Sequence, residues 1–209
     1  MDIIQRLPLP DEICNKIVLY AFKSPHIHLQ EEIFKRAVPK SICQKLVEVG
    51  DIEINAQGHI TKAKCLWNNV DLENLQFDIR ILPNNLTEFG LSSTGVTGDI
   101  QDLPTNLIKF YLNDTGVTGD IQVLQGLQHL TEFSLFNTGV TGDIRVLQGL
   151  PNLSGFNLSN TGVFGDIQVL QSRPKLTEID LENTGVTGDE EAFQNYRKSH
   201  RLEECYMYL

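Results

Sequence analysis

Residues 130–152 read LTEFSLFNTGVTGDIRVLQGLPN, and the spacing of the apolar residues in this stretch decides the fold. Phe133 and Leu135 alternate with polar neighbours, which predicts a short β-strand whose apolar side chains face inward. Further along, Ile144, Leu147 and Leu150 recur at every third position, a spacing that favours 3₁₀-like turns over a long helix. The stretch therefore predicts one strand followed by a loosely helical return segment.

The phrase Thr-Gly-Val-Thr-Gly-Asp-Ile within this stretch recurs along the second half of the chain. A repeat period in the twenties is typical of a solenoid, in which each turn buries its apolar face against its neighbours. Because successive strands run in the same direction one turn apart, we expect them to pair in parallel. The first threonine of the phrase falls at Thr94, Thr115, Thr138, Thr161 and Thr184, in steps of 21, 23, 23 and 23 residues.

The turn resembles the leucine-rich repeat LxxLxLxxNxL in its plant-type form, in which x-G-x-I follows and is matched by Gly142 and Ile144. This resemblance spans residues 65–209 and implies an α/β solenoid. The expected fold is a right-handed coil with a parallel β-sheet on its concave face and a 3₁₀ or irregular convex side. The family's asparagine at the bend is threonine in all five clear turns, and its hydroxyl should serve the same bend with fewer bonds. The glycine after each threonine should let the chain turn tightly: Gly95, Gly116, Gly139, Gly162 and Gly185.

The remaining segments are predicted to close the two ends of the coil. Residues 1–50 are expected to form a helical head, and residues 51–64 a β-hairpin that turns at Gly58 and covers the sheet edge. Residues 65–200 hold the repeats, one degenerate turn and then five clear turns from residue 86, with a short helix over residues 190–199. Residues 201–209 are expected to form a capping strand with Cys205 and Met207 facing inward.

The head has a resemblance of its own. Residues 7–20, LPLPDEICNKIVLY, resemble the opening of an F-box, whose pattern is Leu-Pro-x-Glu followed by spaced Ile and Leu. The resemblance implies that the head binds an adaptor subunit of a cullin-type ubiquitin ligase while the repeats select the substrate. The motif's usual tryptophan is absent from the head, since the chain's one tryptophan is Trp67, and a plain helical cap over the first turn is the alternative. The resemblance is carried by Leu9, Pro10, Glu12, Ile13, Ile17 and Leu19.

Side chains that point out of the predicted strands form the concave face. Aromatic residues among acids suit protein binding, because the rings act as anchors while the charge steers the partner. We therefore predict a recognition module for a partner protein with a basic surface. The aligned repeats place Glu204, on the predicted last strand, beside Glu178 of the preceding strand. The alternative role for Phe136 is to pack against a neighbouring loop. The predicted contact residues are Glu88, Lys109, Tyr111, Asn113, Glu132, Ser134, Phe136, Asn157, Glu178, Asp180, Glu182, Tyr206 and Tyr208.

Two further columns follow from the repeat. One carboxylate per turn offers too few oxygens for calcium, so the aspartates favour a solvated edge over a row of metal ions. The threonines form a regular ladder that would suit a surface-binding, ice-binding or structural solenoid, although Phe164 interrupts it. The columns are Asp99, Asp120, Asp143, Asp166 and Asp189, and Thr97, Thr118, Thr141 and Thr187.

Composition and motifs exclude several other classes. Residues 1–85 carry 11 acidic and 10 basic side chains and residues 86–209 carry 16 and 7, which together give the net charge of −10. The negative second half disfavours nucleic-acid binding. No stretch approaches the ~20 apolar residues of a membrane helix. The absence of a signal-like start and of paired cysteines favours the cytoplasm or nucleus. The five histidines lack catalytic or metal-binding partners at recognisable spacing, so we expect that the protein is not an enzyme and has no cofactor. We also expect a monomer.

Overall fold

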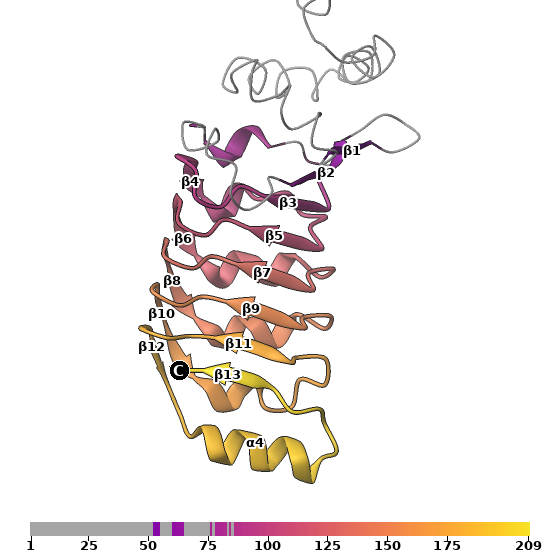
Figure 1. Ribbon diagram of the computed structural model, residues 1–209, viewed down its shortest axis with the longest axis vertical. Helices are drawn as coiled ribbons and strands as arrows, with labels where there is room; N and C mark the ends of the chain where they lie inside the picture. The colour runs from indigo at the N-terminus through magenta and orange to yellow at the C-terminus, as the bar shows by residue number, and fades with distance from the viewer. Residues whose placement is uncertain (1–51, 55–59, 65–75, 77, 83, 85) are drawn as a thin grey trace, which may run out of the picture.

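The computed structural model describes residues 52–54, 60–64, 76, 78–82, 84 and 86–209, and Figure 1 shows a stack of turns that advances along one axis. The predicted head (residues 1–50) and the hairpin turn at Gly58 lie outside the described residues. So does most of the degenerate turn predicted before residue 86. No helix in the described part of the chain is long and apolar enough to span a membrane.

One face of the stack is a sheet of eight strands within the described ranges, in the order β1-β2-β3-β5-β7-β9-β11-β13. Among the described strands of this sheet only β1 and β2 pair antiparallel, and every later pair is parallel, which confirms the predicted parallel pairing. The strands are β1 Ile52–Ile54, β2 Ile60–Lys64, β3 Glu88–Gly90, β5 Lys109–Tyr111, β7 Glu132–Ser134, β9 Gly155–Asn157, β11 Glu178–Asp180 and β13 Tyr206–Tyr208.

The core lies directly behind this sheet. The central residue of each of β3, β5, β7 and β9 is a buried phenylalanine, as the alternation predicts. The rings of Phe89, Phe110, Phe133 and Phe156 stack in one column with centroids 5.9, 5.5 and 5.6 Å apart. Ile179 of β11 continues the column at the register position that follows Phe156. Burial of each ring stabilises the fold by about 1.5–3 kcal/mol, so the column contributes much of the free energy of folding.

A second parallel sheet, which the sequence did not predict, runs along the other side of the turns in the order β12-β10-β8-β6-β4. Its strands carry the Gly-Val-x-Gly-Asp phrase. A 3₁₀ helix follows each of β4, β6, β8 and β10, as the three-residue spacing predicts. The strands are β4 Thr97–Asp99, β6 Gly116–Asp120, β8 Gly139–Asp143, β10 Gly162–Asp166 and β12 Gly185–Thr187, and the 3₁₀ helices are η3 Ile79–Ile81, η4 Ile100–Asp102, η5 Ile121–Gly126, η6 Ile144–Gly149 and η7 Ile167–Leu170.

The bend between the two sheets is held by the repeated threonine. In each turn its hydroxyl donates a hydrogen bond of 2.5–2.7 Å to the carbonyl three residues earlier, as Thr138 does to Leu135. The prediction that the next glycine makes the tight turn is wrong. The left-handed residue is the one before the threonine, with φ of 52–56°, and asparagine tolerates this conformation better than most residues do. These residues are Ser93, Asp114, Asn137, Asn160 and Asn183.

The glycine after the threonine has a different reason to be there. A Cβ atom at Gly116, Gly139 or Gly162 would lie 2.8–2.9 Å from the methyl group of a threonine in the preceding turn. Such a distance is far below van der Waals contact, so only glycine lets the turns approach this closely. The glycine therefore sets the spacing between turns.

The far end of the stack is closed by helix α4 (Glu190–Ser199) and by β13, which Figure 1 shows in yellow. Asp189 caps the helix, accepting a hydrogen bond from the Ala192 amide at 3.0 Å. Phe193 lies buried between α4 and the last turn. The Gln194 amide group bonds the main-chain oxygen and nitrogen of Cys205, at 2.5 and 3.5 Å. The helix therefore closes the end of the core and holds the residue that leads into β13.

Arg197 of α4 is fully buried with its charge facing main-chain oxygens. Its guanidinium donates to the carbonyls of Glu203 at 2.8 Å, Arg173 at 2.7 Å and Leu176 at 2.7 Å. Burial lowers the pKa of this group, and the three short bonds compensate for the lost hydration. One side chain therefore connects α4 to the last return segment and to the segment that precedes β13.

Candidate protein-binding face

The outward side chains of the eight-stranded sheet form two rows, because each parallel pair keeps its residues in register. In the first row Tyr206, not Glu204, lies beside Glu178, so the predicted register of the last strand is wrong by two residues. The first row is Glu88, Lys109, Glu132, Gly155, Glu178 and Tyr206, and the second row is Gly90, Tyr111, Ser134, Asn157, Asp180 and Tyr208.

The charges in the first half of the face are paired with one another. Lys109 Nζ donates to Glu132 Oε1 at 2.7 Å, and Tyr111 Oη donates to Glu132 Oε2 at 2.9 Å. Lys62 Nζ lies 3.3 Å from Glu88 Oε1. The charges of Lys62 and Lys109 are therefore each balanced by a neighbouring carboxylate.

These contacts also change the pKa values of the groups involved. Burial alone would raise the pKa of Glu132, but the hydrogen bonds from Lys109 and Tyr111 outweigh it and lower the pKa. Burial raises the pKa of the Tyr111 hydroxyl, and the bond to Glu132 raises it further. Glu132 is thus ionised and Tyr111 neutral across the physiological range, which keeps the network intact.

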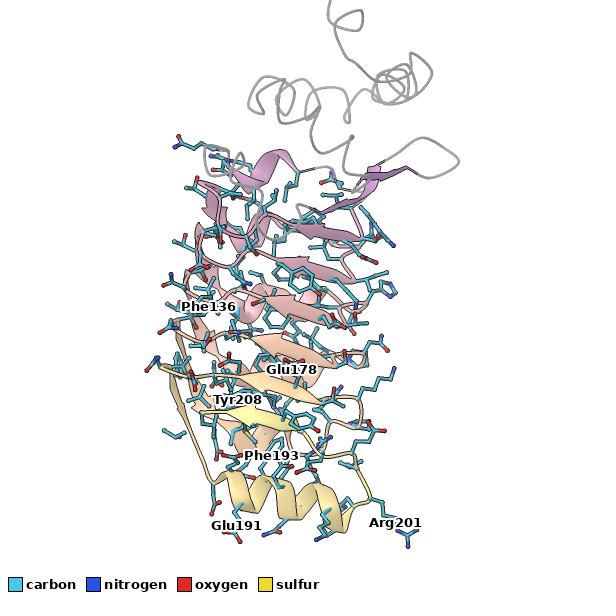
Figure 2. All side chains as sticks on the ribbon, viewed as in Figure 1. Phe136, Glu178, Glu191, Phe193, Arg201 and Tyr208 are labelled. Carbon is cyan, nitrogen blue, oxygen red and sulfur yellow. The ribbon has the colours of Figure 1, made fainter. Side chains whose placement is uncertain are left out.

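The second half of the face is acidic and aromatic. Tyr206 and Tyr208 are 69% and 56% exposed, and their register partners on β11 are Glu178 and Asp180. Figure 2 shows Glu178 and Tyr208 on these neighbouring strands at the front of the sheet. Asn157 donates to Asp180 at 2.8 Å, whereas the Glu178 carboxylate makes no hydrogen bond or ion pair within the described part of the chain. This half therefore offers two exposed rings beside negative charge.

Not every predicted contact residue reaches the surface. Asn113 and Ser134 are only 6% and 7% exposed. The Asn113 side chain accepts a hydrogen bond from the Phe136 amide at 3.2 Å, a structural role in the bend. Phe136 is half-buried at the end of its turn. Glu182, two residues after Asp180 in the chain, is exposed. The most exposed part of the face thus lies toward its C-terminal end.

The aspartate column has a structural role that was not predicted from the sequence. Each of these carboxylates accepts a main-chain N–H at the start of the helix that follows, over 2.8–3.0 Å. The signal was present, because aspartate is a preferred residue at a helix N-cap. Among the described residues no group of three or more His, Cys, Asp or Glu is placed to hold a metal ion.

The threonine column lies exposed on the second sheet, with Phe164 at its break. The Phe164 ring is 51% exposed. Cys205, which directly precedes β13, is buried as predicted. Burial raises the pKa of its thiol to about 11, so the group stays protonated and unreactive. The F-box-like positions of the head lie outside the described residues.

Several solved structures resemble this fold, whereas no family model and no curated protein matches the chain. Internalin C2 from Listeria monocytogenes is 30% identical over 52% of this chain and 47% of its own, with a TM-score of 0.43. The PEPR1–AtPEP1 structure is 19% identical over 66% of this chain and 20% of its own, with a TM-score of 0.55. The BIR2 ectodomain from Arabidopsis thaliana is 17% identical over 66% and 75%, with a TM-score of 0.50.

This chain thus spans less than half of the internalin and a fifth of PEPR1. The likeness to PEPR1 and BIR2, together with the parallel sheet and the 3₁₀ return segments, identifies the fold as an α/β solenoid of leucine-rich repeats.

Proposed function

We propose that this chain is a recognition module that binds a partner protein across the outer face of its eight-stranded sheet. The observation that carries the proposal is the pair of exposed rings, Tyr206 and Tyr208, in register with Glu178 and Asp180. Tyrosine supplies a large contact area at a low cost in side-chain entropy, and it is enriched among the residues that dominate binding energy. Folding does not need these rings in solvent.

The charge of the face favours a partner with a basic surface. Lys62 and Lys109 pair with Glu88 and Glu132, and the rows of the face from β9 to β13 hold no basic residue that would offset the acids around the two tyrosines. Unbalanced negative charge raises the association rate of a cationic partner, and this effect weakens as salt screens it. In the same fold class, the PEPR1 structure contains AtPEP1, and the proposal extends partner binding from that protein to this chain.

Two other hypotheses remain predictions. The ligase-subunit hypothesis rests on the sequence of residues 9–19 alone. The surface-binding or structural hypothesis rests on the threonine column, which the bulky Phe164 ring interrupts. A chain lacking residues 1–50 tests the first, since only the intact chain should recover a ligase adaptor subunit.

The proposal is tested by affinity capture from cell extract with three full-length proteins. These are the unchanged chain, a Tyr206→Ser and Tyr208→Ser double variant, and Phe164→Ser as a control that removes an exposed ring from the other sheet. We expect the double variant to lose about 30-fold or more in affinity for the captured partner, the loss that corresponds to a hot spot of about 2 kcal/mol. Phe164→Ser should bind like the unchanged chain.

Site-specific cross-linking then locates the contact. A benzoylphenylalanine at position 208 should form a covalent adduct with the same partner, and one at position 164 should not. A partner that is retained by the double variant, or that cross-links equally from both positions, would show that the outer face is not the binding surface.

A further inference from the structure

The first row of the outer face has a gap at its centre. Gly155 of β9 lies between Glu132 on one neighbouring strand and Glu178 on the other. It therefore leaves a position without a side chain between two carboxylates. The row continues beyond Glu178 with the exposed ring of Tyr206.

The fold does not require glycine at this position. The φ of Gly155 is not in the left-handed region, and a Cβ atom would lie 3.5 Å from Glu178 Cβ, an ordinary van der Waals contact. Glycine inside a strand lowers stability and often marks a place where a ligand approaches the backbone closely. Gly90 differs because it is buried, with the Tyr111 side chain 3.8 Å from the position of its missing Cβ atom. Gly155 remains partly exposed.

The two carboxylates beside the gap are not equivalent. Glu132 is fixed by Lys109 and Tyr111, so it forms a rigid wall with its charge already balanced. Glu178 is exposed and makes no hydrogen bond or ion pair of its side chain in the part of the chain that the structure describes. A cation that enters over Gly155 therefore finds its partner on the β11 side.

We propose that the gap at Gly155 receives an arginine side chain of the partner protein. The aliphatic stem lies across Gly155 against the wall formed by Glu132, and the guanidinium pairs with the Glu178 carboxylate. Strands one step apart lie about 4.8 Å from each other, which brings the guanidinium within reach of the Tyr206 ring. A planar, weakly hydrated guanidinium suits a carboxylate beside an aromatic face better than an ammonium does. This inference rests on the proposed function and specifies its central contact.

The test uses the full chain and two fluorescein-labelled hexapeptides, Ser-Arg-Ser-Arg-Ser-Arg and the same peptide with citrulline in place of arginine. Citrulline keeps the shape of arginine and removes its charge. Fluorescence anisotropy should give a Kd about two- to fivefold lower for the arginine peptide, the ratio that an exposed ion pair supplies. The preference should weaken with added salt.

Two variants remove the site in different ways. Glu178→Gln removes the charge with little change in shape, and Gly155→Leu fills the gap. Each should bring the ratio of the two Kd values to about one, because neither leaves a paired position for the guanidinium. The controls are Glu191→Gln, which removes an equal charge on α4, and Gly126→Leu, where no atom lies within 4 Å of the added Cβ. Both controls should keep the preference, and thermal unfolding should show all four variants folded.

The outcomes separate this inference from the function on which it rests. If both peptides bind equally, or the preference persists in Glu178→Gln, the arginine site is wrong. The binding face still stands in that case, provided that partner capture remains sensitive to Tyr206 and Tyr208. If capture is insensitive to those tyrosines, the proposed function fails, and an arginine preference that survives in Gly155→Leu would then reflect net charge alone.

Discussion

Arg197→Met should destabilise the C-terminal end of the solenoid. The methionine fills much of the space but donates no hydrogen bond, so the carbonyls of Arg173, Leu176 and Glu203 lose donors at 2.7, 2.7 and 2.8 Å. Each buried acceptor left without a partner costs about 1–3 kcal/mol. The Arg173 carbonyl keeps a longer bond from the Leu176 amide at 3.4 Å. The other two carbonyls give an upper range of roughly 2–6 kcal/mol, and water entering the gap reduces this to about 2–4 kcal/mol. The loss is a large share of the roughly 5–15 kcal/mol by which a domain is stable.

Urea unfolding followed by circular dichroism measures the total loss of stability, and hydrogen exchange shows which part of the chain is affected. The amides of Leu181 and Leu202, which bond to Tyr208 and Arg197 carbonyls, should exchange faster, while amides in the first turns should not change. Lys198→Met is the matched control, because it makes the same kind of change at an exposed position of the same helix. A cost below about 1 kcal/mol, or one equal to that of the control, would refute the assignment of Arg197 as the tie between α4 and the last turn.

Four further outcomes follow from the repeat and the face. Thr138→Val should lower the free energy of unfolding by about 1 kcal/mol through loss of the 2.6 Å bond to Leu135, and Thr138→Ser should restore most of it, as thermal unfolding would show. Asp143→Ala removes the N-cap of η6 and should lower the free energy of unfolding by about 0.5–2 kcal/mol in the same measurement. Asp143→Asn should lower it much less, because asparagine also caps a helix. Gly165→Ala should lower the free energy of unfolding, because Gly165 has a φ of 131° and the added Cβ would lie 2.8 Å from Asp143 Oδ1. Gly126→Ala should not lower it, because no atom lies within 4 Å of the added Cβ. Because the pKa of Glu132 is lowered in the folded state, its ionised form stabilises the fold above the ordinary value of 4.5, and this contribution is lost as pH falls through the lowered value. The stability difference between the unchanged chain and Glu132→Gln in urea should therefore shrink between about pH 6 and about pH 3.

Most of the fold was predictable because the repeat presents the same pattern in every turn. The alternation at Phe133 identifies the inward side of each strand, and the three-residue spacing after Ile144 identifies the 3₁₀ helices. The second sheet was not predicted, since glycines such as Gly139 and Gly142 weaken the strand pattern and their role in turn spacing appears only when neighbouring turns are present. The left-handed Asn137 was visible in principle, because asparagine is one of the few residues that favours that conformation.

The C-terminal end was the least predictable part. Alternation alone cannot distinguish registers that differ by two residues, because both bury Met207. The true register depends on the packing of α4 and on the turn at Arg201, whose φ is 58°. An arginine on a short helix is normally assigned to the surface, so no local pattern indicated that Arg197 would be buried. The candidate face depended on that register, and therefore the pairing of Tyr206 with Glu178 emerged only from the structure.

The close contact between turns also determines how such a protein evolves. Gly139 rests on the methyl group of Thr118 as Gly162 rests on that of Thr141, so the internal turns are interchangeable modules. An in-frame duplication of one 23-residue unit would insert without new incompatibilities, and it would lengthen the outer face by about 4.8 Å and by one residue per row. The chemistry of the outer face can therefore change by duplication followed by drift at outward positions, as the differing side chains of Glu132, Gly155 and Glu178 already illustrate.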